Sequence, residues 1–294
     1  MNIINTIINK DVLEGLKDIT DEIVSLTTTS PPYNVLSGSK NYDSIDDDLP
    51  YKEYLDWLKK VFTEVFRVTR PGGRCAINID AMTNRQDDKD QEYVRCIYAH
   101  LYNIMTEIGW KFRTEICWYK QNTVGKKTAH GSWDSCSNPV IKRNHEYVLV
   151  FSKDSWRLEG DDELSDMTSE EFLRYTMSCW GVENKDRIAP ETRNLCGHPC
   201  PFCEELVKRL IKLFSYRGDL VLDPFNGTGT TTCVAKKLSR NYIGIDISED
   251  YCEYARQRTA QVIDLFEVKY IPRSERLKRK KKKEEKVEDM FASD

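Results

Sequence analysis

Four residues that could hold a reacting group stand together at Ser30-Pro31-Pro32-Tyr33, after a stretch typical of a buried strand. Two successive prolines fix the backbone and remove two N–H donors, so carbonyl groups project rigidly. The serine hydroxyl and one carbonyl can accept both hydrogens of an amino group on a planar base, and the tyrosine ring can stack on that base. Such a loop would position the amino nitrogen and stabilise its developing positive charge. The alternative is a rigid proline loop with a surface tyrosine.

A glycine turn, Asp223-Pro-Phe-Asn-Gly-Thr-Gly-Thr-Thr, lies between a hydrophobic strand pattern and a helix start. Gly227 and Gly229 allow a ligand to approach the backbone closely and to meet its N–H groups. The pattern excludes a Walker phosphate loop, which needs a lysine where threonines stand here. Asp246 closes the next predicted strand, where a doubly wound fold places a carboxylate on a ribose. The turn indicates a nucleoside ligand; alternatively the glycines only make a tight turn and Asp246 caps the next helix.

Strand-like and helix-like stretches alternate along the chain and must position these two loops. The expected strands cover residues 3–8, 22–28, 74–79, 111–119, 146–151, 219–222 and 241–247. The expected helices cover residues 11–19, 51–69, 93–108, 204–214, 231–238 and 249–263, and Pro71-Gly72-Gly73 predicts a turn. This alternation predicts an α/β fold, doubly wound around a mostly parallel sheet.

The composition fits an ordinary globular protein of one large domain or two modest ones. The chain has 294 residues, of which 39% are hydrophobic, and a formal net charge of −4. It lacks both an apolar run near the roughly 18 residues of a membrane span and a signal-peptide pattern, so we expect a cytoplasmic protein. Ten cysteines without a regular framework are expected to be reduced thiols.

Basic residues are concentrated in two places despite the acidic net charge. The polar stretch 121–144 is long and without periodicity, which is typical of a functional or mobile connection, and it carries Lys126, Lys127, Lys142 and Arg143. Residues 273–283 form a basic run. Such a run is usually a solvated, partly disordered terminus; the alternative is non-specific attraction of DNA.

Together these segments resemble the β-group of amino-methyltransferases that act on DNA. In that group the catalytic loop precedes the cofactor loop, a circular permutation of the usual order, as residues 29–33 precede residues 223–231 here. Three further segments fit: Arg70-Pro-Gly-Gly73, His145-Glu-Tyr-Val-Leu-Val-Phe151 and His198-Pro-Cys-Pro-Phe202. The resemblance covers nearly the whole chain, from about residue 1 to residue 263.

The resemblance implies a permuted, seven-stranded methyltransferase sheet that binds S-adenosylmethionine and double-stranded DNA. Its catalytic residues would be Ser30, Pro31, Pro32 and Tyr33. The glycine turn and residues 198–202 would line the methionine side of the cofactor, Asp246 would hold the ribose, and Asp11 would lie near the adenine. The full set of expected cofactor contacts is Asp11, His198, Pro199, Phe202, Asp223, Pro224, Phe225, Gly227, Thr228, Gly229, Thr230 and Asp246.

The same resemblance divides the chain. Residues 1–151 would form the catalytic half, including the DNA-contacting loop 121–144, where Lys126, Lys127, Lys142 and Arg143 would bind phosphates. Residues 152–196 would be an inserted target-recognition segment, residues 197–264 the cofactor-binding half, and residues 265–294 a basic, disordered tail. The target base would be flipped out of the duplex.

The first residue of the catalytic loop bears on the choice of base. In the family, serine there mostly accompanies N4-cytosine methylation and aspartate mostly N6-adenine methylation, so Ser30 predicts N4-cytosine, with adenine as the alternative. We expect a nucleoid-associated monomer or homodimer in a restriction–modification or related system, with a cognate endonuclease as a partner. Further alternatives are an RNA or protein-amide methyltransferase, whose loop usually begins with asparagine, and a non-catalytic DNA-binding scaffold.

A cluster of four metal-capable residues follows the central region: Cys196, His198, Cys200 and Cys203. Such a cluster could form a zinc knuckle. However, a second cysteine pair at the usual spacing is missing, and His198 belongs to the family segment, so we assign no metal. His145 is treated as structural, because transfer from a sulfonium needs little base assistance before attack.

Overall fold

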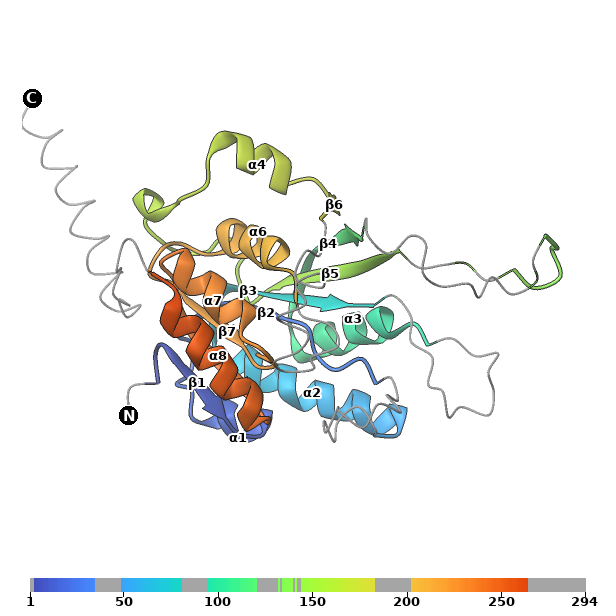
Figure 1. Ribbon diagram of the computed structural model, residues 1–294, viewed down its shortest axis with the longest axis horizontal. Helices are drawn as coiled ribbons and strands as arrows, with labels where there is room; N and C mark the ends of the chain where they lie inside the picture. Colours follow the sequence, from blue (N-terminus) through green and yellow to red (C-terminus); the bar gives the residue numbers. More distant parts are fainter. Residues whose placement is uncertain are drawn as a thin grey trace, which may run out of the picture.

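The computed structural model describes residues 3–34, 49–80, 95–120, 132, 134–139, 141, 144–182 and 202–263 (Figure 1). Within them lies one eight-stranded sheet of order β1-β8-β7-β2-β3-β5-β4-β6. The strands are β1 (Thr6–Asn9), β2 (Val24–Thr29), β3 (Thr69–Ile79), β4 (Lys111–Tyr119), β5 (His145–Ser152), β6 (Cys179–Gly181), β7 (Leu220–Asp223) and β8 (Asn241–Asp246). Only β5 runs antiparallel to its two neighbours, β3 and β4. The prediction of a mostly parallel α/β sheet is confirmed.

Helices cover both faces of this sheet (Figure 1). α1 (Val12–Lys17), α2 (Tyr51–Val68) and α3 (Ile97–Ile108) bury their apolar sides on one face. α6 (Glu204–Phe214) and α7 (Thr230–Lys237) lie on the other face, and α8 (Glu249–Gln261) packs beside them against β1. None of the helices among the described residues is long and apolar enough to span a membrane.

The start and the end of the described chain meet at one edge of the sheet. β1 pairs in parallel with β8, and Asn9 lies opposite Asp246. β7 then joins β8 to β2, so the carboxyl ends of β1, β8, β7 and β2 follow one another along one rim. Since open α/β sheets hold ligands at such a rim, the fold brings together loops that are distant in sequence.

The sheet has one strand more than the seven expected. The additional strand, β6, pairs in parallel with β4 at the far edge. Trp180 of β6 is 1% exposed, and the indole of Trp118 on β4 donates to the Val182 carbonyl at 3.0 Å. Three residues in a polar stretch carry too little periodicity to predict a strand. The turn predicted at Pro71-Gly72-Gly73 is a bulge inside β3: Gly72 has a φ of 76°, and the pairing with β2 moves from Thr69 to Arg74 across it.

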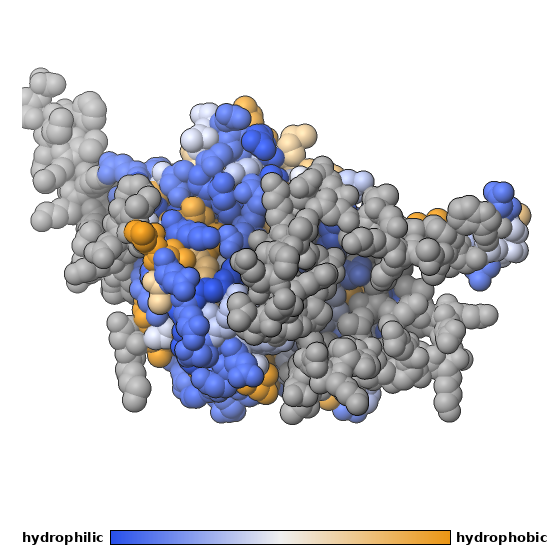
Figure 2. Space-filling view, in the orientation of Figure 1, coloured by the Kyte–Doolittle hydropathy of each residue, from blue (hydrophilic) through white to orange (hydrophobic). Residues whose placement is uncertain are grey.

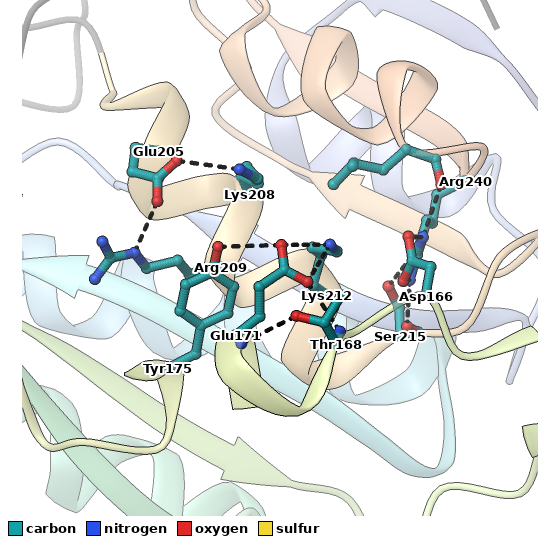
Figure 3. Close-up of polar contacts among 11 residues, drawn as sticks. Asp166, Thr168, Glu171, Tyr175, Glu205, Lys208, Arg209, Lys212, Ser215 and Arg240 are labelled. Atoms are coloured by element: carbon teal, nitrogen blue, oxygen red, sulfur yellow. Dashed lines mark hydrogen bonds and ion pairs between the residues drawn. The ribbon is translucent and has the colours of Figure 1, made fainter. Parts of the chain in front are cut away.

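The segment before β6 docks on α6 through polar contacts (Figure 3). It contains the short helix α4 (Ser169–Tyr175), begun by a Thr168–Glu171 capping box. Glu171 pairs with Lys212 of α6 at 2.6 Å. Asp166 accepts from both terminal nitrogens of the fully buried Arg240 side chain, at 2.6 and 2.8 Å. These ion pairs fix α4 on the outer side of α6, where the surface in Figure 2 is mostly hydrophilic.

Candidate active site

The Ser30–Tyr33 loop begins where β2 leaves the sheet. Ser30 Oγ lies 3.0 Å from the Tyr33 hydroxyl, which brings the two ends of the loop together. The buried Tyr54 of α2 donates its hydroxyl proton to the Pro32 carbonyl at 2.6 Å. Among the described residues, none donates to the carbonyl of Pro31. The carbonyl of Pro31, and not that of Pro32, is therefore available to a substrate.

A polar chain runs from Tyr33 across the sheet. The Asn78 side-chain amide, on β3, donates to the Tyr33 hydroxyl at 2.8 Å and to Glu146 Oε2 at 2.8 Å. Glu146 stands on β5 and pairs through Oε1 with Lys120, which follows β4. Asn78 and Glu146 are 2% and 9% exposed. Buried polar groups so connected hold a fixed geometry, and they support the loop from beneath.

Asp223 connects the Ser30–Tyr33 loop to the glycine turn. It ends β7, fully enclosed, and its Oδ1 accepts from the Thr29 hydroxyl at 2.6 Å and from the Phe225 N–H at 3.1 Å. Burial raises the pKa of Asp223 to about 6, although its hydrogen bonds to threonine hydroxyls and to the Phe225 N–H act in the opposite direction. The residue before Ser30 is thus tied directly to the first residue of the glycine turn.

The glycine turn leads into α7, with Gly229 as the N-cap residue at φ 81°. A Cβ on Gly229 would lie 2.6 Å from the Ala255 Cβ of α8. Asn226 is 4% exposed, and neither of its side-chain polar atoms finds a partner within the described ranges. An orphaned buried amide beside a helix N-terminus is a feature of a ligand cradle.

Asp246 faces this turn from β8. Its carboxylate accepts from the Gly227 N–H at 2.7 Å and from the Ser248 N–H at 2.9 Å. Burial raises the pKa of Asp246. Ser248, not Asp246, is the N-cap of α8, so the capping alternative is wrong. Asp11, after β1, caps α1 by accepting from Leu13 N at 2.9 Å.

Of the described members of the predicted site, all but Phe202 meet at the rim, while others lie outside the described residues. At the rim are the Ser30–Tyr33 loop, the turn from Asp223 to Thr230, Asp246 and Asp11; Phe225 also contacts the Trp57 ring, with centroids 5.6 Å apart. Phe202 packs against the α6 side of the core. Outside the described residues lie His198, Pro199, Lys126, Lys127, Lys142, Arg143, Cys196 and Cys200. Cys203, the last of the metal-capable cluster, is buried in the core at the start of α6.

Sequence reasoning missed the supporting residues Tyr54, Asn78, Lys120 and Glu146. The available signal was a polar residue inside an apolar strand, at Asn78 and Glu146, since such residues need a partner when buried. The residues present fit S-adenosylmethionine: the helix N-terminus and orphaned amide suit its amino-acid end, and the carboxylates of Asp223 and Asp246 suit its cationic groups and its hydroxyls.

Comparison with known proteins agrees with this geometry. The sequence model of the N6_N4_Mtase family, described as DNA methylase, matches residues 24–257. Type II methyltransferase M.MjaVI of Methanocaldococcus jannaschii is 36% identical over 175 residues, 60% of this chain and 84% of that protein. DNA adenine methyltransferase YhdJ of Escherichia coli K12 is 28% identical over 260 residues, 86% of this chain and 82% of that protein.

Solved structures share the fold. TTHA0409 of Thermus thermophilus, complexed with S-adenosylmethionine, superposes with a TM-score of 0.68 at 27% identity, covering 92% of this chain and 98% of that one. The cytosine-N4-specific PvuII DNA methyltransferase gives 0.66 at 22% identity, with coverages of 86% and 85%; at this identity the likeness concerns the fold. The chain belongs to the N6/N4 family of DNA methylases and is an S-adenosylmethionine-dependent DNA methyltransferase.

Proposed function

We propose that this chain transfers a methyl group to the exocyclic N4 of a flipped cytosine in double-stranded DNA, at a specific sequence. The observation that carries the proposal is that two acceptors, Ser30 Oγ and the Pro31 carbonyl, lie in a loop joined directly to the glycine turn that would hold the cofactor. The hydrogen bond between Thr29 and Asp223 makes that connection. We also propose that the order of its loops is the circular permutation of the β-group, with Ser30-Pro31-Pro32-Tyr33 as its catalytic motif.

The loop residues would act by position. Ser30 Oγ and the Pro31 carbonyl accept the two amino hydrogens, which turns the nitrogen lone pair out of conjugation and toward the methyl donor. Tyr33 contributes a ring face, and Tyr54 holds the Pro32 carbonyl in place. S-adenosylmethionine supplies an electrophilic methyl group on a sulfonium. The nitrogen becomes cationic as it is methylated, and the accepting oxygens stabilise that charge before the proton leaves.

The cofactor would lie along the rim of the sheet. We assign its methionine end to the turn from Asp223 to Thr230 together with residues 198–202, its ribose to Asp246 and its adenine to the neighbourhood of Asp11. Asp246 already accepts two backbone N–H groups, so a ribose hydroxyl would use the remaining lone pairs of a fixed carboxylate.

For DNA, we assign phosphate contacts to Lys126, Lys127, Lys142 and Arg143, and target recognition to the segment 152–196. The described part of that segment is acidic around η3 (Asp162–Leu164) and α4 and is paired with α6. We therefore place its DNA contacts beyond β6, where Lys185, Arg187 and Arg193 stand. A cognate endonuclease and a location at the nucleoid stay predictions.

N6-adenine is the second candidate. It is favoured by the 28% identity to YhdJ, a DNA adenine methyltransferase, over most of both chains. The two targets present the same chemical group, an exocyclic amine on a flipped ring, so the loop geometry serves both. The choice of cytosine follows from serine as the first loop residue.

Nucleoside mass spectrometry of DNA from expressing cells tests the proposal. In a host without endogenous methylation, the wild-type chain should produce N4-methylcytosine, and Ser30→Ala should abolish it. Cofactor should still raise the melting temperature of the S30A variant. At a cofactor concentration one hundred times Kd, the folded state should gain about 2.7 kcal/mol of stability. N6-methyladenine would favour the second candidate. Unmodified DNA from cells that produce a folded chain able to bind cofactor would contradict both candidates.

A further inference from the structure

Arg258 reaches from α8 to the glycine turn. Its Nη1 donates to the Thr228 carbonyl at 2.7 Å and to the Thr228 hydroxyl at 3.5 Å. Its Nη2 donates to Oε1 of Glu204, the first residue of α6, at 3.1 Å. A guanidinium is planar and presents its N–H groups in a fixed fork, so the acceptors that it binds are held in a fixed relation. Arg258 therefore joins the turn both to α6 and to α8.

The peptide between Thr228 and Gly229 is held at both of its polar groups. Arg258 binds its carbonyl, and its N–H donates to the Asn226 carbonyl at 2.9 Å. Glycines stand on either side of Thr228, Gly227 with φ 48° and Gly229 with φ 81°. Since glycine adopts positive and negative φ with similar ease, this peptide could otherwise rotate. Rotation would exchange the positions of its carbonyl and its N–H, and a carbonyl in place of an N–H disfavours an anionic group.

The surroundings of Arg258 strengthen these contacts. The Arg258 side chain is 23% exposed and Thr228 is 6% exposed. Hydrogen bonds with a charged partner are about twice as strong as neutral ones, and partial burial limits their weakening by water. Glu204 also pairs with Lys237 at the end of α7, at 2.9 Å. The helix that starts at the turn is thus connected to the same carboxylate.

We infer that Arg258 is a positioning residue that sets the affinity for S-adenosylmethionine through the glycine turn. It keeps the Thr228 carbonyl directed toward α8. It also fixes the distance between the turn and the start of α6, which directly follows residues 198–202. The inference rests on the proposed assignment of the methionine end of the cofactor to these two segments, and it adds what holds them together.

The Arg258→Gln variant removes the charge and shortens the side chain, so both contacts are lost. We expect Kd and KM for S-adenosylmethionine to rise about tenfold. The kcat at saturating cofactor and the Kd for DNA should stay unchanged, because bound cofactor itself holds the turn. The Arg258→Lys variant keeps the charge without the fork and should weaken cofactor binding only about threefold. Calorimetric titration and steady-state kinetics measure these values.

The Arg256→Gln variant is the matched control on the same helix. Arg256 pairs with Glu249 and Glu253 and donates to the Ile7 carbonyl, away from the turn and α6. Its substitution should leave Kd and KM for the cofactor at wild-type values.

Equal losses of affinity in R256Q and R258Q would overturn the role of Arg258, as would a wild-type Kd in R258Q. If R258Q does not fold, a wild-type Kd in R258K would overturn it as well. A wild-type chain that binds the cofactor but methylates no DNA amino group would instead overturn the proposed function, and the effect of Arg258 on cofactor affinity would stand.

Discussion

At the residue scale, Thr29 and Asp223 couple the two halves of the site through one hydrogen bond. The Thr29 hydroxyl and the Asp223 carboxyl are both enclosed, 2.6 Å apart, and come from neighbouring strands. A shift of either strand would move the Ser30–Tyr33 loop and the glycine turn together. Since Asp223 is buried with a pKa of about 6, its charge also links this contact to pH.

Asp223→Asn should change how stability depends on pH. The folded-state pKa of about 6 lies above the ordinary 3.8, so the folded protein holds the proton more tightly than the unfolded chain. That contribution is fully present below about pH 4 and is lost as pH rises through 6. Relative to D223N, the wild-type free energy of unfolding should therefore fall by about 2.4 kcal/mol between pH 4 and pH 7.

Denaturant unfolding of both proteins at several pH values in that range, without cofactor, measures this difference. Asparagine can still accept from Thr29, so the variant keeps the contact and loses only the titration. A difference between the two proteins that is independent of pH would show that Asp223 is not a titrating, buried carboxyl.

The sequence was sufficient to predict the two loops of the site but not the residues that support them. Ser30–Tyr33 and the turn from Asp223 each carry their chemistry in consecutive residues. Tyr54, Asn78 and Glu146 reach the loop from separate elements, and their partners follow from sheet order and register, which local pattern does not specify. Buried polar contacts between distant strands are therefore the part that only the folded chain reveals.

At the element scale, Gly229 serves helix packing as well as ligand approach. Its left-handed φ of 81° lets α7 begin directly at the rim, and its missing side chain lets α8 approach through Ala255. The turn that would hold the cofactor is thus positioned by contact between two helices, and its geometry depends on how closely they pack.

Gly229→Ala should weaken both stability and cofactor binding. The left-handed conformation costs a side-chain-bearing residue about 1–2 kcal/mol, and the new Cβ would lie 2.6 Å from that of Ala255. If relief of this clash displaces the turn, a loss of about 1.4 kcal/mol in binding makes Kd for S-adenosylmethionine about tenfold weaker. Calorimetric titration and thermal unfolding measure the two effects.

Gly109→Ala is the matched control. Gly109 ends α3 with φ 114°, but the nearest atom to a Cβ there is Phe66 Cζ at 3.7 Å, an ordinary contact. This variant should lose stability through strain alone and keep the wild-type cofactor affinity. Equal losses of affinity in both variants would show that instability, not the position of the turn, weakens binding.

Elements with a long, regular pattern were predicted nearly to the residue, as at β4 and α6. The short elements between β5 and α6 were not, because α4 and β6 owe their place to partners elsewhere in the chain. Glu171 needs Lys212, and β6 needs the exposed edge of β4. Tertiary contacts, not local propensity, decide segments of this length.

At the scale of the whole molecule, charge is distributed unevenly. The segment around α4 is acidic and its carboxylates are partly used to hold α6 and Arg240. The basic residues are concentrated in the sequence at 121–144 and 273–283. Carboxylates repel DNA phosphates and basic side chains attract them, so a protein of acidic net charge can still bind DNA through locally basic segments.

Neutralising Lys126, Lys127, Lys142 and Arg143 to glutamine should reduce the salt dependence of DNA binding. Each phosphate that is no longer neutralised lowers the slope of log K against log salt concentration by about 0.9, so the four substitutions predict a decrease of about 3 to 4. Fluorescence anisotropy from low to moderate salt measures it. Neutralising residues 280–283 of the basic tail is the matched control. A smaller slope only in the tail variant would show that the tail, and not the loop, contacts the phosphates. An unchanged slope in the first variant would show that the loop does not contact DNA.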